Sequence, residues 1–476
     1  MPSRSERTLA LPRDLPSLRA VADQVFSRTA GAPLVEGNAT RVLRDATENY
    51  PVWNDAITSA RTSVHVEMYI IHRDEVGRRF VSLLAEKARQ GVAVRLIYDW
   101  FGCGFGPMLG LFTPLIRAGG DVRVFNPPAL SSTLGWLRRD HRKLIVVDGR
   151  VAFVSGLCVG QMWQGRPEKK LEPWRDTGVE IVGPAVAHAE EAFAESWRMA
   201  GGRAEDIAIP NGDRRGSVSL RLIPTEPFTG SMLRLDMLVT ALARRSLWLT
   251  DAYFIGTFAY IEALRRAAHD GVDVRLLVPQ NSDVGWTVPA ARSLYRPLLE
   301  AGVRIFEWNG TMVHSKTAIA DSRWARIGST NLNVNSWFGN WELDVAVEDE
   351  GVAGTLAAHY LEDLDRSTEI VLQTYRLAAR PRPTSARPAS RRYRSSRRVV
   401  RTVTDVGRSL GAAVTGNRRL EDFEAGPVIA TALVLTALAA LAFFMPAALA
   451  WPFGALALWT AITFFAEAWG LWRKKP

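Results

Sequence analysis

The chain has 476 residues, of which 47% are hydrophobic and 23% are charged, and this composition excludes a disordered or collagen-like protein. The length predicts two domains or one large duplicated domain. Two cysteines, Cys103 and Cys158, are too few for a disulfide framework, and no CxxC pair offers a metal ribbon. The net charge of +10 predicts an anionic partner, which is a nucleic acid, a membrane surface or a charged substrate.

An internal repeat follows an N-terminal extension, residues 1–36, which has no apolar run long enough for a secretory signal. The two copies, 57–99 and 239–280, each predict a helix, an apolar strand, an amphipathic helix, a glycine and a second apolar strand. Strands that alternate with helices are typical of α/β folds. We therefore expect two α/β sandwich halves that pack together, with a site at their junction.

Each half also carries the motif HxKxxxxD, in register with the repeat. Residues two apart in a strand share a face, so each histidine is expected beside a lysine. A nucleophile or proton carrier paired with a cation suits an anionic phosphodiester, whose transition state spreads charge over its oxygens. One HxK would be a weak signal, but two in register are a strong one. The motif residues, which we predict to be catalytic, are His141, Lys143, Asp148, His314, Lys316 and Asp321.

The excess positive charge lies after the repeat. Residues 376–426 hold thirteen Arg, no Lys and four acidic residues, a net of +9, whereas the first 375 residues have a net charge of −1. Within this stretch, residues 379–401 have too few apolar residues to fold alone. The whole stretch is interpreted as a linker that lies on anionic headgroups or is merely solvated, and its second part permits a short interfacial helix. A nucleic-acid-binding protein usually spreads its basic residues over the folded domain, so we expect no nucleic-acid partner.

The chain ends in an apolar region, residues 427–472, with one charge in 46 residues. Its length predicts a transmembrane helical hairpin that turns near Pro446. Basic residues flank both ends, which places both ends and the catalytic body in the cytoplasm. The chain is thus expected to be a multi-pass membrane protein. A single kinked or re-entrant segment and a buried hairpin in a soluble core are the alternatives.

Residues from about 37 to 375 resemble the phospholipase D superfamily, and within it bacterial cardiolipin synthases. The resemblance implies two phospholipase D-like halves, 37–205 and 206–375, with the active site between them. It also implies a two-step transfer through a covalent phosphohistidine, without metal or cofactor, with phosphatidylglycerol as the substrate. The location that it implies is the bacterial inner membrane. The segments that carry it are EMYIIHRDEVGRRF, DHRKLIVVDGRVAFVSGLCVG, WRDTGVEIVGPAV, VHSKTAIAD and IGSTNLNVNSWFGNWELDVAV.

The resemblance also implies a role for each motif residue. His141 would be the nucleophile, and His314 would protonate the leaving alcohol and then deprotonate the acceptor hydroxyl. Lys143 and Lys316 would hold the non-bridging oxygens of the phosphate. The motif aspartates, Asp148 and Asp321, would be structural rather than proton-transfer groups.

Further site residues come from the same resemblance. Asp176 and Glu342 would orient the two histidines. Asn331 would donate a hydrogen bond to the phosphate, and Ser329 and Ser155 are further candidates for substrate contacts. The sequence departs from the family pattern where the first copy has Cys158 in place of the asparagine, since a thiol is a poorer donor than an amide. A separate nucleophilic role for Cys158 is disfavoured, because nothing in the sequence supplies its base.

Four functions are compatible with the motifs. The leading one is a membrane-bound phosphatidyltransferase that makes cardiolipin from phosphatidylglycerol and releases glycerol. The second is a phospholipase D that hydrolyses phospholipid to phosphatidic acid, and sequence spacing does not separate it from the first. A nuclease is disfavoured by the neutral body and the predicted hairpin. A non-catalytic lipid-binding protein is disfavoured because both His/Lys pairs are intact. The sequence leaves the oligomeric state open.

Overall fold

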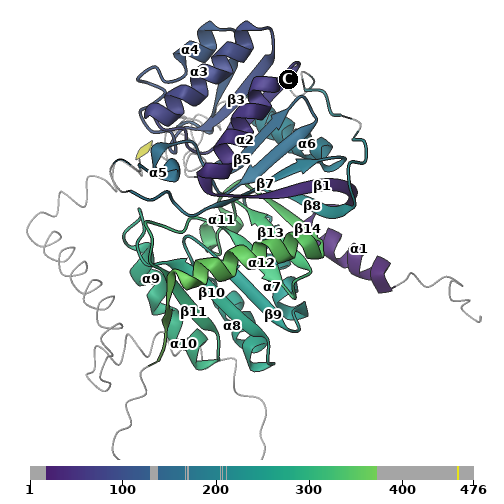
Figure 1. Ribbon diagram of the computed structural model, residues 1–476, viewed down its shortest axis with the longest axis vertical. Helices are drawn as coiled ribbons and strands as arrows, with labels where there is room; N and C mark the ends of the chain where they lie inside the picture. Colours follow the sequence, from purple (N-terminus) through teal and green to yellow (C-terminus); the bar gives the residue numbers. More distant parts are fainter. Residues whose placement is uncertain are drawn as a thin grey trace, which may run out of the picture.

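The computed structural model describes residues 18–128, 138–166, 168, 171–203, 205, 207–210, 212–372 and 458–459. After helix α1 (Leu18–Ala30) the chain forms two successive α/β halves (Figure 1). The elements of the first half are β1 (Val35–Arg44), α2 (Asp45–Ser59), β2 (Ser63–Met68), α3 (Glu75–Arg89), β3 (Ala93–Asp99), α4 (Thr113–Arg117), β4 (Asp121–Phe125), β5 (Lys143–Val147), β6 (Val151–Ser155), α5 (Gln161–Gln164), β7 (Thr177–Val182) and α6 (Ala185–Met199).

The second half repeats this order, except that it has two short helices where the first half has α4 and that it adds a final strand. Its elements are β8 (Val218–Thr225), α7 (Ser231–Leu242), β9 (Ser246–Thr250), α8 (Phe258–His269), β10 (Asp273–Pro279), α9 (Thr287–Ser293), α10 (Tyr295–Glu300), β11 (Arg304–Trp308), β12 (Thr317–Ala320), β13 (Trp324–Gly328), α11 (Val334–Phe338), β14 (Glu342–Glu348), α12 (Glu350–Asp365) and β15 (Ser367–Ile370).

The strand order shows the duplication directly. The strands form one hydrogen-bonded array, β15-β11-β10-β9-β12-β13-β14-β8-β1-β7-β6-β5-β2-β3-β4. Outward from the β1–β8 contact, equivalent strands follow in the same order on both sides. In each half three strands are parallel, β2-β3-β4 and β9-β10-β11, and the others pair antiparallel. The predicted pair of α/β halves is therefore confirmed.

The amphipathic helices predicted in the repeat are α3 and α8, which connect parallel strands. Each ends before a glycine, Gly91 or Gly271, with φ near +90°. This left-handed conformation ends the helix at little steric cost only for a residue without a Cβ. The chain then enters the next strand, β3 or β10. The repeated glycine therefore ends the helix for the same conformational reason in both halves.

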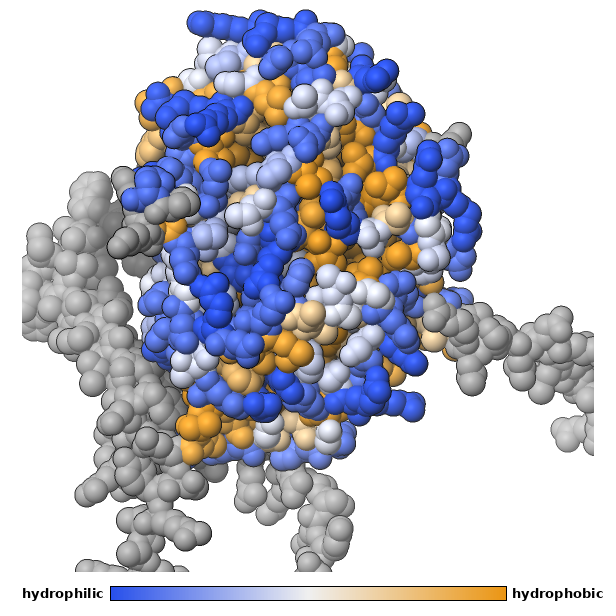
Figure 2. Space-filling model, in the orientation of Figure 1, coloured by the Kyte–Doolittle hydropathy of each residue, from blue (hydrophilic) through white to orange (hydrophobic). Residues whose placement is uncertain are grey.

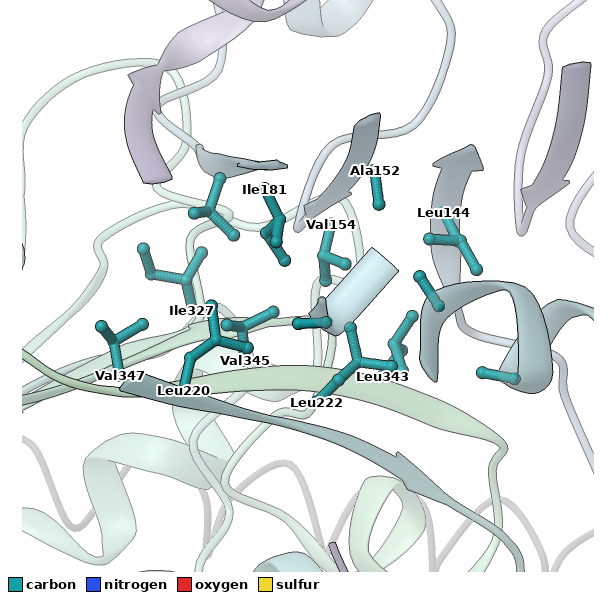
Figure 3. Packing of buried hydrophobic residues seen from close by; sticks show 14 of the residues in the cluster. Leu144, Ala152, Val154, Ile181, Leu220, Leu222, Ile327, Leu343, Val345 and Val347 are labelled. Carbon is teal, nitrogen blue, oxygen red and sulfur yellow. The ribbon is translucent and has the colours of Figure 1, made fainter. Parts of the chain in front are cut away.

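The junction between the halves is a buried hydrophobic core. Apolar residues of β5, β6 and β7 face those of β8, β13 and β14, as Figure 3 shows for Leu144, Val154, Leu222 and Val345. Apolar residues of α6 and α12 belong to the same cluster. Two further clusters cover the outer faces of the sheets, one beneath α2 and α3 and one beneath α7 and α8. The shared core makes the two halves one rigid support for a site at their junction.

The ends of the chain are described only in part. Helix α1 lies within the predicted extension, residues 1–36, and packs against α7 of the second half. The predicted linker, 376–426, lies outside the described residues, as does the predicted hairpin, 427–472, apart from Leu458 and Trp459. Among the helices of the described residues, none combines the length and hydropathy that crossing a bilayer requires. The face of the molecule in Figure 2 is mostly hydrophilic, with hydrophobic patches between.

Candidate active site

Each motif histidine is anchored to the opposite half of the molecule. The backbone N–H of His141 donates to the carbonyl of Trp341 (2.8 Å), and that of His314 donates to the carbonyl of Arg175 (2.7 Å). The segments around these bonds run parallel to each other as isolated β-bridges. Each histidine, placed just before β5 or β12, therefore lies beside a segment of the other half.

The residue after each anchoring carbonyl is a carboxylate that binds the histidine ring. Nδ1 of His141 lies 2.8 Å from Oε2 of Glu342, and Nδ1 of His314 lies 2.7 Å from Oδ2 of Asp176. Both carboxylates are fully buried. A carboxylate on Nδ1 selects the tautomer whose reactive nitrogen is Nε2. The structure thus places Asp176 and Glu342 as the histidine partners, each across the junction.

Burial sets the charge of these pairs. It lowers the pKa of His141, and burial together with the Lys316 ammonium lowers the pKa of His314 to about 4. Burial alone would raise the pKa of Asp176, but His314 and Lys316 outweigh it and hold that pKa below its usual value. The pKa of Glu342 is lowered in the same way against burial, chiefly by His141. At neutral pH the free protein therefore holds two neutral imidazoles on two ionised carboxylates.

The two motif lysines lie beneath the histidines. Lys143 and Lys316 are both 1% exposed, and each Nζ donates to the carbonyl of its own motif histidine. Nζ of Lys143 lies 5.0 Å from the centre of the Tyr69 ring, and Nζ of Lys316 lies 5.7 Å from that of Tyr253. Burial lowers the pKa of Lys316 to about 8. The arrangement concentrates positive charge beside two uncharged rings, which suits an anionic ligand.

Both histidines open into one cavity of about 650 Å³ between the halves. The first half lines it with apolar side chains, among them Phe101, Trp163 and Trp174. The second half adds a polar wall that includes Asn333 and Asn335. The rings of Trp163 and Trp174 lie 5.7 and 5.5 Å from the ring of His314. An apolar wall beside a polar one fits an amphiphilic substrate.

Asn331 and Cys158, which are equivalent in the repeat, both line this cavity. Nδ2 of Asn331 donates to Oγ of Ser336 (3.3 Å), while its Oδ1 is buried without a hydrogen-bond partner in the described structure. Cys158 is 1% exposed, and burial raises the pKa of its thiol. A protonated thiol is a weak nucleophile, so the geometry offers Cys158 as a cavity wall.

The two candidate serines lie behind the cavity rather than among the described residues that line it. Oγ of Ser329 donates to Oε2 of Glu342 (2.6 Å). Oγ of Ser155 donates to the carbonyl of Leu157 (3.3 Å). Ser329 therefore contacts the carboxylate that holds His141, and Ser155 contacts the backbone of Leu157.

The motif aspartates lie at the ends of β5 and β12 that are farther from the histidines. Asp148 accepts hydrogen bonds from the backbone N–H groups of residues 61–63, and Asp321 accepts them from those of residues 244–246. Both residues adopt a positive φ at the start of a tight turn. They close the loops that lead into β2 and β9, so the structure does not bring them to the histidine pair.

Several residues that support the site were not singled out in the sequence. Nδ2 of Asn340 donates to Oε1 of Glu342 (3.1 Å). Oδ1 of Asp45 accepts from the backbone N–H of Asp176 (2.8 Å). Tyr69 and Tyr253 form equivalent parts of the cavity. The sequence does contain a signal for the two tyrosines, because a tyrosine follows the first strand of both copies. It contains no such signal for Asp45, because Asp45 precedes the repeat.

This fold and site define a class, that of two-half phospholipase D-like enzymes with paired HxKxxxxD motifs. Residues 54–161 and 239–366 match the family described as cardiolipin synthase, phospholipase D-like domain. The chain is 35% identical to cardiolipin synthase A of Pseudomonas fluorescens (strain SBW25) over 349 residues, 71% of each chain. It is 32% identical to the cardiolipin synthase of Geobacillus sp. (strain WCH70) over 362 residues, 74% of this chain and 71% of that protein.

A solved structure shows the same fold. Phosphatidylserine synthase of Haemophilus influenzae Rd KW20 aligns with a TM-score of 0.56 at 11% identity, over 73% of this chain and 91% of its own. The chain belongs to the cardiolipin synthase family, as the resemblance implied. It is a phosphatidyltransferase of the phospholipase D superfamily.

Proposed function

We propose that this enzyme transfers a phosphatidyl group from one phosphatidylglycerol to a hydroxyl of a second, releasing glycerol and forming cardiolipin. The observation that carries the proposal is the pair of histidines in one cavity, each held at Nδ1 by a buried carboxylate of the opposite half. Two such rings provide the two functions that a double displacement requires, a nucleophile and a proton carrier.

In the first step Nε2 of His141 attacks the phosphorus, and the bond from phosphorus to the glycerol oxygen breaks. Glycerol leaves with a proton from His314. The pKa of His314 is about 4 in the free protein, and a bound anionic phosphodiester raises it, because a nearby negative charge favours the protonated ring. In the second step His314 takes a proton from the acceptor hydroxyl, whose oxygen attacks phosphorus and breaks the P–N bond.

The remaining site residues hold the phosphate. Lys143 and Lys316 balance the charge on its non-bridging oxygens, and the amide of Asn331 adds a hydrogen bond. The proposed mechanism uses no metal or cofactor. The apolar wall with Phe101 and Trp174 disfavours water as the acceptor, which supports transfer over hydrolysis.

One observation favours the reverse assignment of the histidines. The pKa of His314 is lowered to about 4, by burial and by Lys316, and a ring that resists protonation is better suited to attack than to donate a proton. Trapping the covalent intermediate in acid-free denaturant and mapping the phosphorylated peptide distinguishes the two. A phosphate on His141 supports the proposal, and one on His314 reverses the roles.

For attachment, we propose that the Arg-rich linker, residues 376–426, and the apolar region, residues 427–472, tether the enzyme to the bacterial inner membrane with its catalytic body in the cytoplasm. The support is their charge and apolar length. Labelling of a cysteine introduced in the linker should fail from outside intact cells and succeed after lysis.

The activity is tested with purified protein and phosphatidylglycerol vesicles, without added metal, by following the lipid products. Cardiolipin with an equal amount of glycerol is the expected result. Phosphatidic acid as the only product would replace the proposal with hydrolysis by a phospholipase D. His141→Ala and His314→Ala should each abolish turnover, and retained turnover in either variant would refute the mechanism.

A further inference from the structure

Exposed apolar side chains surround the opening of the active-site cavity. Phe101, Met162, Trp286 and Val334 all line it, yet these residues are 56%, 37%, 65% and 53% exposed. They belong to four separate segments, two in each half. In Figure 1 the nearby helices α5 and α9 lie on the same side of the molecule, one on each side of the junction. The mouth of the cavity is therefore an apolar ring built by both halves.

The segment after β3 extends this ring. From Trp100 to Phe112 it carries no charge. Met108 and Phe105 are 83% and 77% exposed, the two highest values among the large hydrophobic side chains of the described residues, and Leu109 is 60% exposed. Contiguous exposed apolar residues of this kind mark an interaction surface.

The base of this segment is fixed, which holds its apolar tip outward. Oδ1 of Asp99 accepts hydrogen bonds from the backbone N–H groups of Phe101 and Gly102, both at 2.9 Å. A Cβ on Gly102 would lie 2.2 Å from the carbonyl oxygen of Tyr69, so the backbone is tightly seated there. The exposure of Phe105 and Met108 is thus built into the fold.

Arginines lie against the exposed rings. The guanidinium of Arg139 lies 4.3 Å from the centre of the Phe101 ring, and that of Arg138 lies 4.6 Å from the centre of the Phe228 ring, a residue that is 71% exposed. Such pairs place an apolar ring where hydrocarbon begins and a cation where phosphate groups lie. This charge complements an anionic lipid surface, where each basic group is worth about 1 kcal/mol.

We propose that the apolar rim, defined as Phe101, Phe105, Met108, Leu109 and Trp286, inserts into the interface of an anionic bilayer with the cavity mouth facing the lipid. This inference rests on the proposed function and deepens it. A phosphatidylglycerol headgroup then enters the cavity while its acyl chains stay in hydrocarbon. The contact is made by the catalytic body, independently of the apolar region, residues 427–472.

Turnover tests the rim with a double variant, Phe105→Asp with Met108→Asp, because neither residue lines the cavity. The expected result is a loss of about tenfold or more in cardiolipin formation from phosphatidylglycerol vesicles, since two apolar groups that entered lipid become charges. Turnover of a short-chain phosphatidylglycerol below its micelle concentration should stay within twofold of the parent protein, which also shows that the variant folds. Equal activity of variant and parent on vesicles would overturn the inference.

The matched control is Leu242→Asp. Leu242 is 51% exposed at the end of α7, next to the Asp321 end of β12 and so at the opposite end of the sheet from the histidines. This variant should keep vesicle turnover within twofold. A loss equal to that of the double variant would show that the effect is one of surface charge in general, and the rim would then not be a bilayer contact.

A fluorescent probe at one position distinguishes membrane contact by the rim from membrane attachment by the apolar region, residues 427–472, and from catalysis. Both native cysteines are buried, so a polarity-sensitive fluorophore attached to Met108→Cys or Leu242→Cys reports one position. Anionic vesicles should shift the emission to the blue only at position 108, and spin labels on the acyl chains should quench it. This measurement needs no turnover, so its result is independent of the proposed function. The proposed function fails only if the parent protein forms no cardiolipin.

Two other outcomes at position 108 would also overturn the inference. Blue-shifted emission that rises with protein concentration without vesicles would assign the rim to a second copy of the chain. Blue-shifted emission at all protein concentrations without vesicles would assign it to a segment of the same chain.

Discussion

Ser329 donates its hydroxyl to Glu342 across 2.6 Å, and the acceptor is Oε2, the same oxygen that holds Nδ1 of His141 at 2.8 Å. The equivalent position of the first half is Gly156, where a Cβ would lie 2.1 Å from Oδ1 of Asp176. The two histidines are therefore supported differently. The longer Glu342 is braced by a hydroxyl, whereas the shorter Asp176 occupies space that only a glycine leaves open.

Ser329→Ala should lower kcat about tenfold with little change in KM. The hydrogen bond from Ser329 helps to hold the buried Glu342 carboxylate, and bonds to charged groups contribute about 1.5–3 kcal/mol. Its loss loosens the ring of His141 without removing a substrate contact. Steady-state kinetics on phosphatidylglycerol vesicles measure the effect, and Ser329→Thr, which keeps the hydroxyl, should recover most of the rate. An unchanged kcat in the alanine variant would show that Glu342 needs no brace.

Gly156→Ala should cost more, about 100-fold in kcat, because the new methyl group must push Asp176 away from His314, and a misplacement of about 1 Å has that effect. Circular dichroism and the melting temperature should show that the variant remains folded. The two alanine substitutions add or remove a group of similar size. A loss no larger than that of Ser329→Ala would mean that Asp176 tolerates displacement.

The family resemblance indicated which carboxylates serve the histidines but not how they pair. Along the chain Asp176 follows His141, and Glu342 follows His314, so proximity favours pairs within each half. The bonds instead join His141 to Glu342 and His314 to Asp176, across 201 and 138 residues. The exchange arises because each motif runs beside a backbone segment of the other half. Such long-range pairing depends on tertiary packing, which no local pattern encodes.

The fold was predictable for a different reason. Hydrophobic periodicity and the repeated glycines are local signals, and both copies give the same one, so the α/β order follows from the sequence. The apolar rim was not predictable in this way. The residues of a Gly-rich apolar segment such as 100–112 are equally compatible with core packing, and only the tertiary structure shows Phe105 and Met108 exposed.

Cys158→Asn should strengthen phosphate binding, since it places an amide where the second half has Asn331. Both positions line the same cavity, and the two side chains are similar in size. A new hydrogen bond to a charged ligand is worth about 1.5–3 kcal/mol. We expect only part of this energy to be gained, which corresponds to a rise in kcat/KM of about three- to tenfold. Kinetics on short-chain phosphatidylglycerol measure it. A decrease in kcat/KM with an unchanged melting temperature would show that the thiol is required.

Asp148→Ala should destabilise the protein by about 1–3 kcal/mol while each folded molecule keeps its activity. Its carboxylate accepts three backbone N–H groups and the hydroxyl of Thr62, and unsatisfied donors carry a cost of that size. Asp321→Ala should behave alike. Denaturant unfolding gives the stability, and turnover per active site gives the activity. Lost turnover at unchanged stability would instead make these aspartates part of the chemistry.

The activity should fall as the pH rises through about 8. Burial lowers the pKa of Lys316 to about 8, so the ammonium that balances the phosphate charge is present below that pH and is lost above it. His314 adds a decline at lower pH, because its pKa is about 4 in the free protein and only its protonated ring can donate a proton to the leaving alcohol. We therefore expect kcat/KM to fall gradually as the pH rises above about 4, and more steeply above about 8 where the Lys316 ammonium is lost as well.

Lys316→Arg isolates the group responsible for the alkaline decline. A guanidinium stays charged at every accessible pH, so the decline near pH 8 should disappear in this variant, although its maximal activity should be lower because a planar fork does not reproduce the position of Nζ. Initial rates on short-chain phosphatidylglycerol between pH 5 and 10 avoid effects of pH on vesicles. An alkaline decline that persists unchanged in Lys316→Arg would assign it to another group, and the charge of Lys316 would then not limit the reaction.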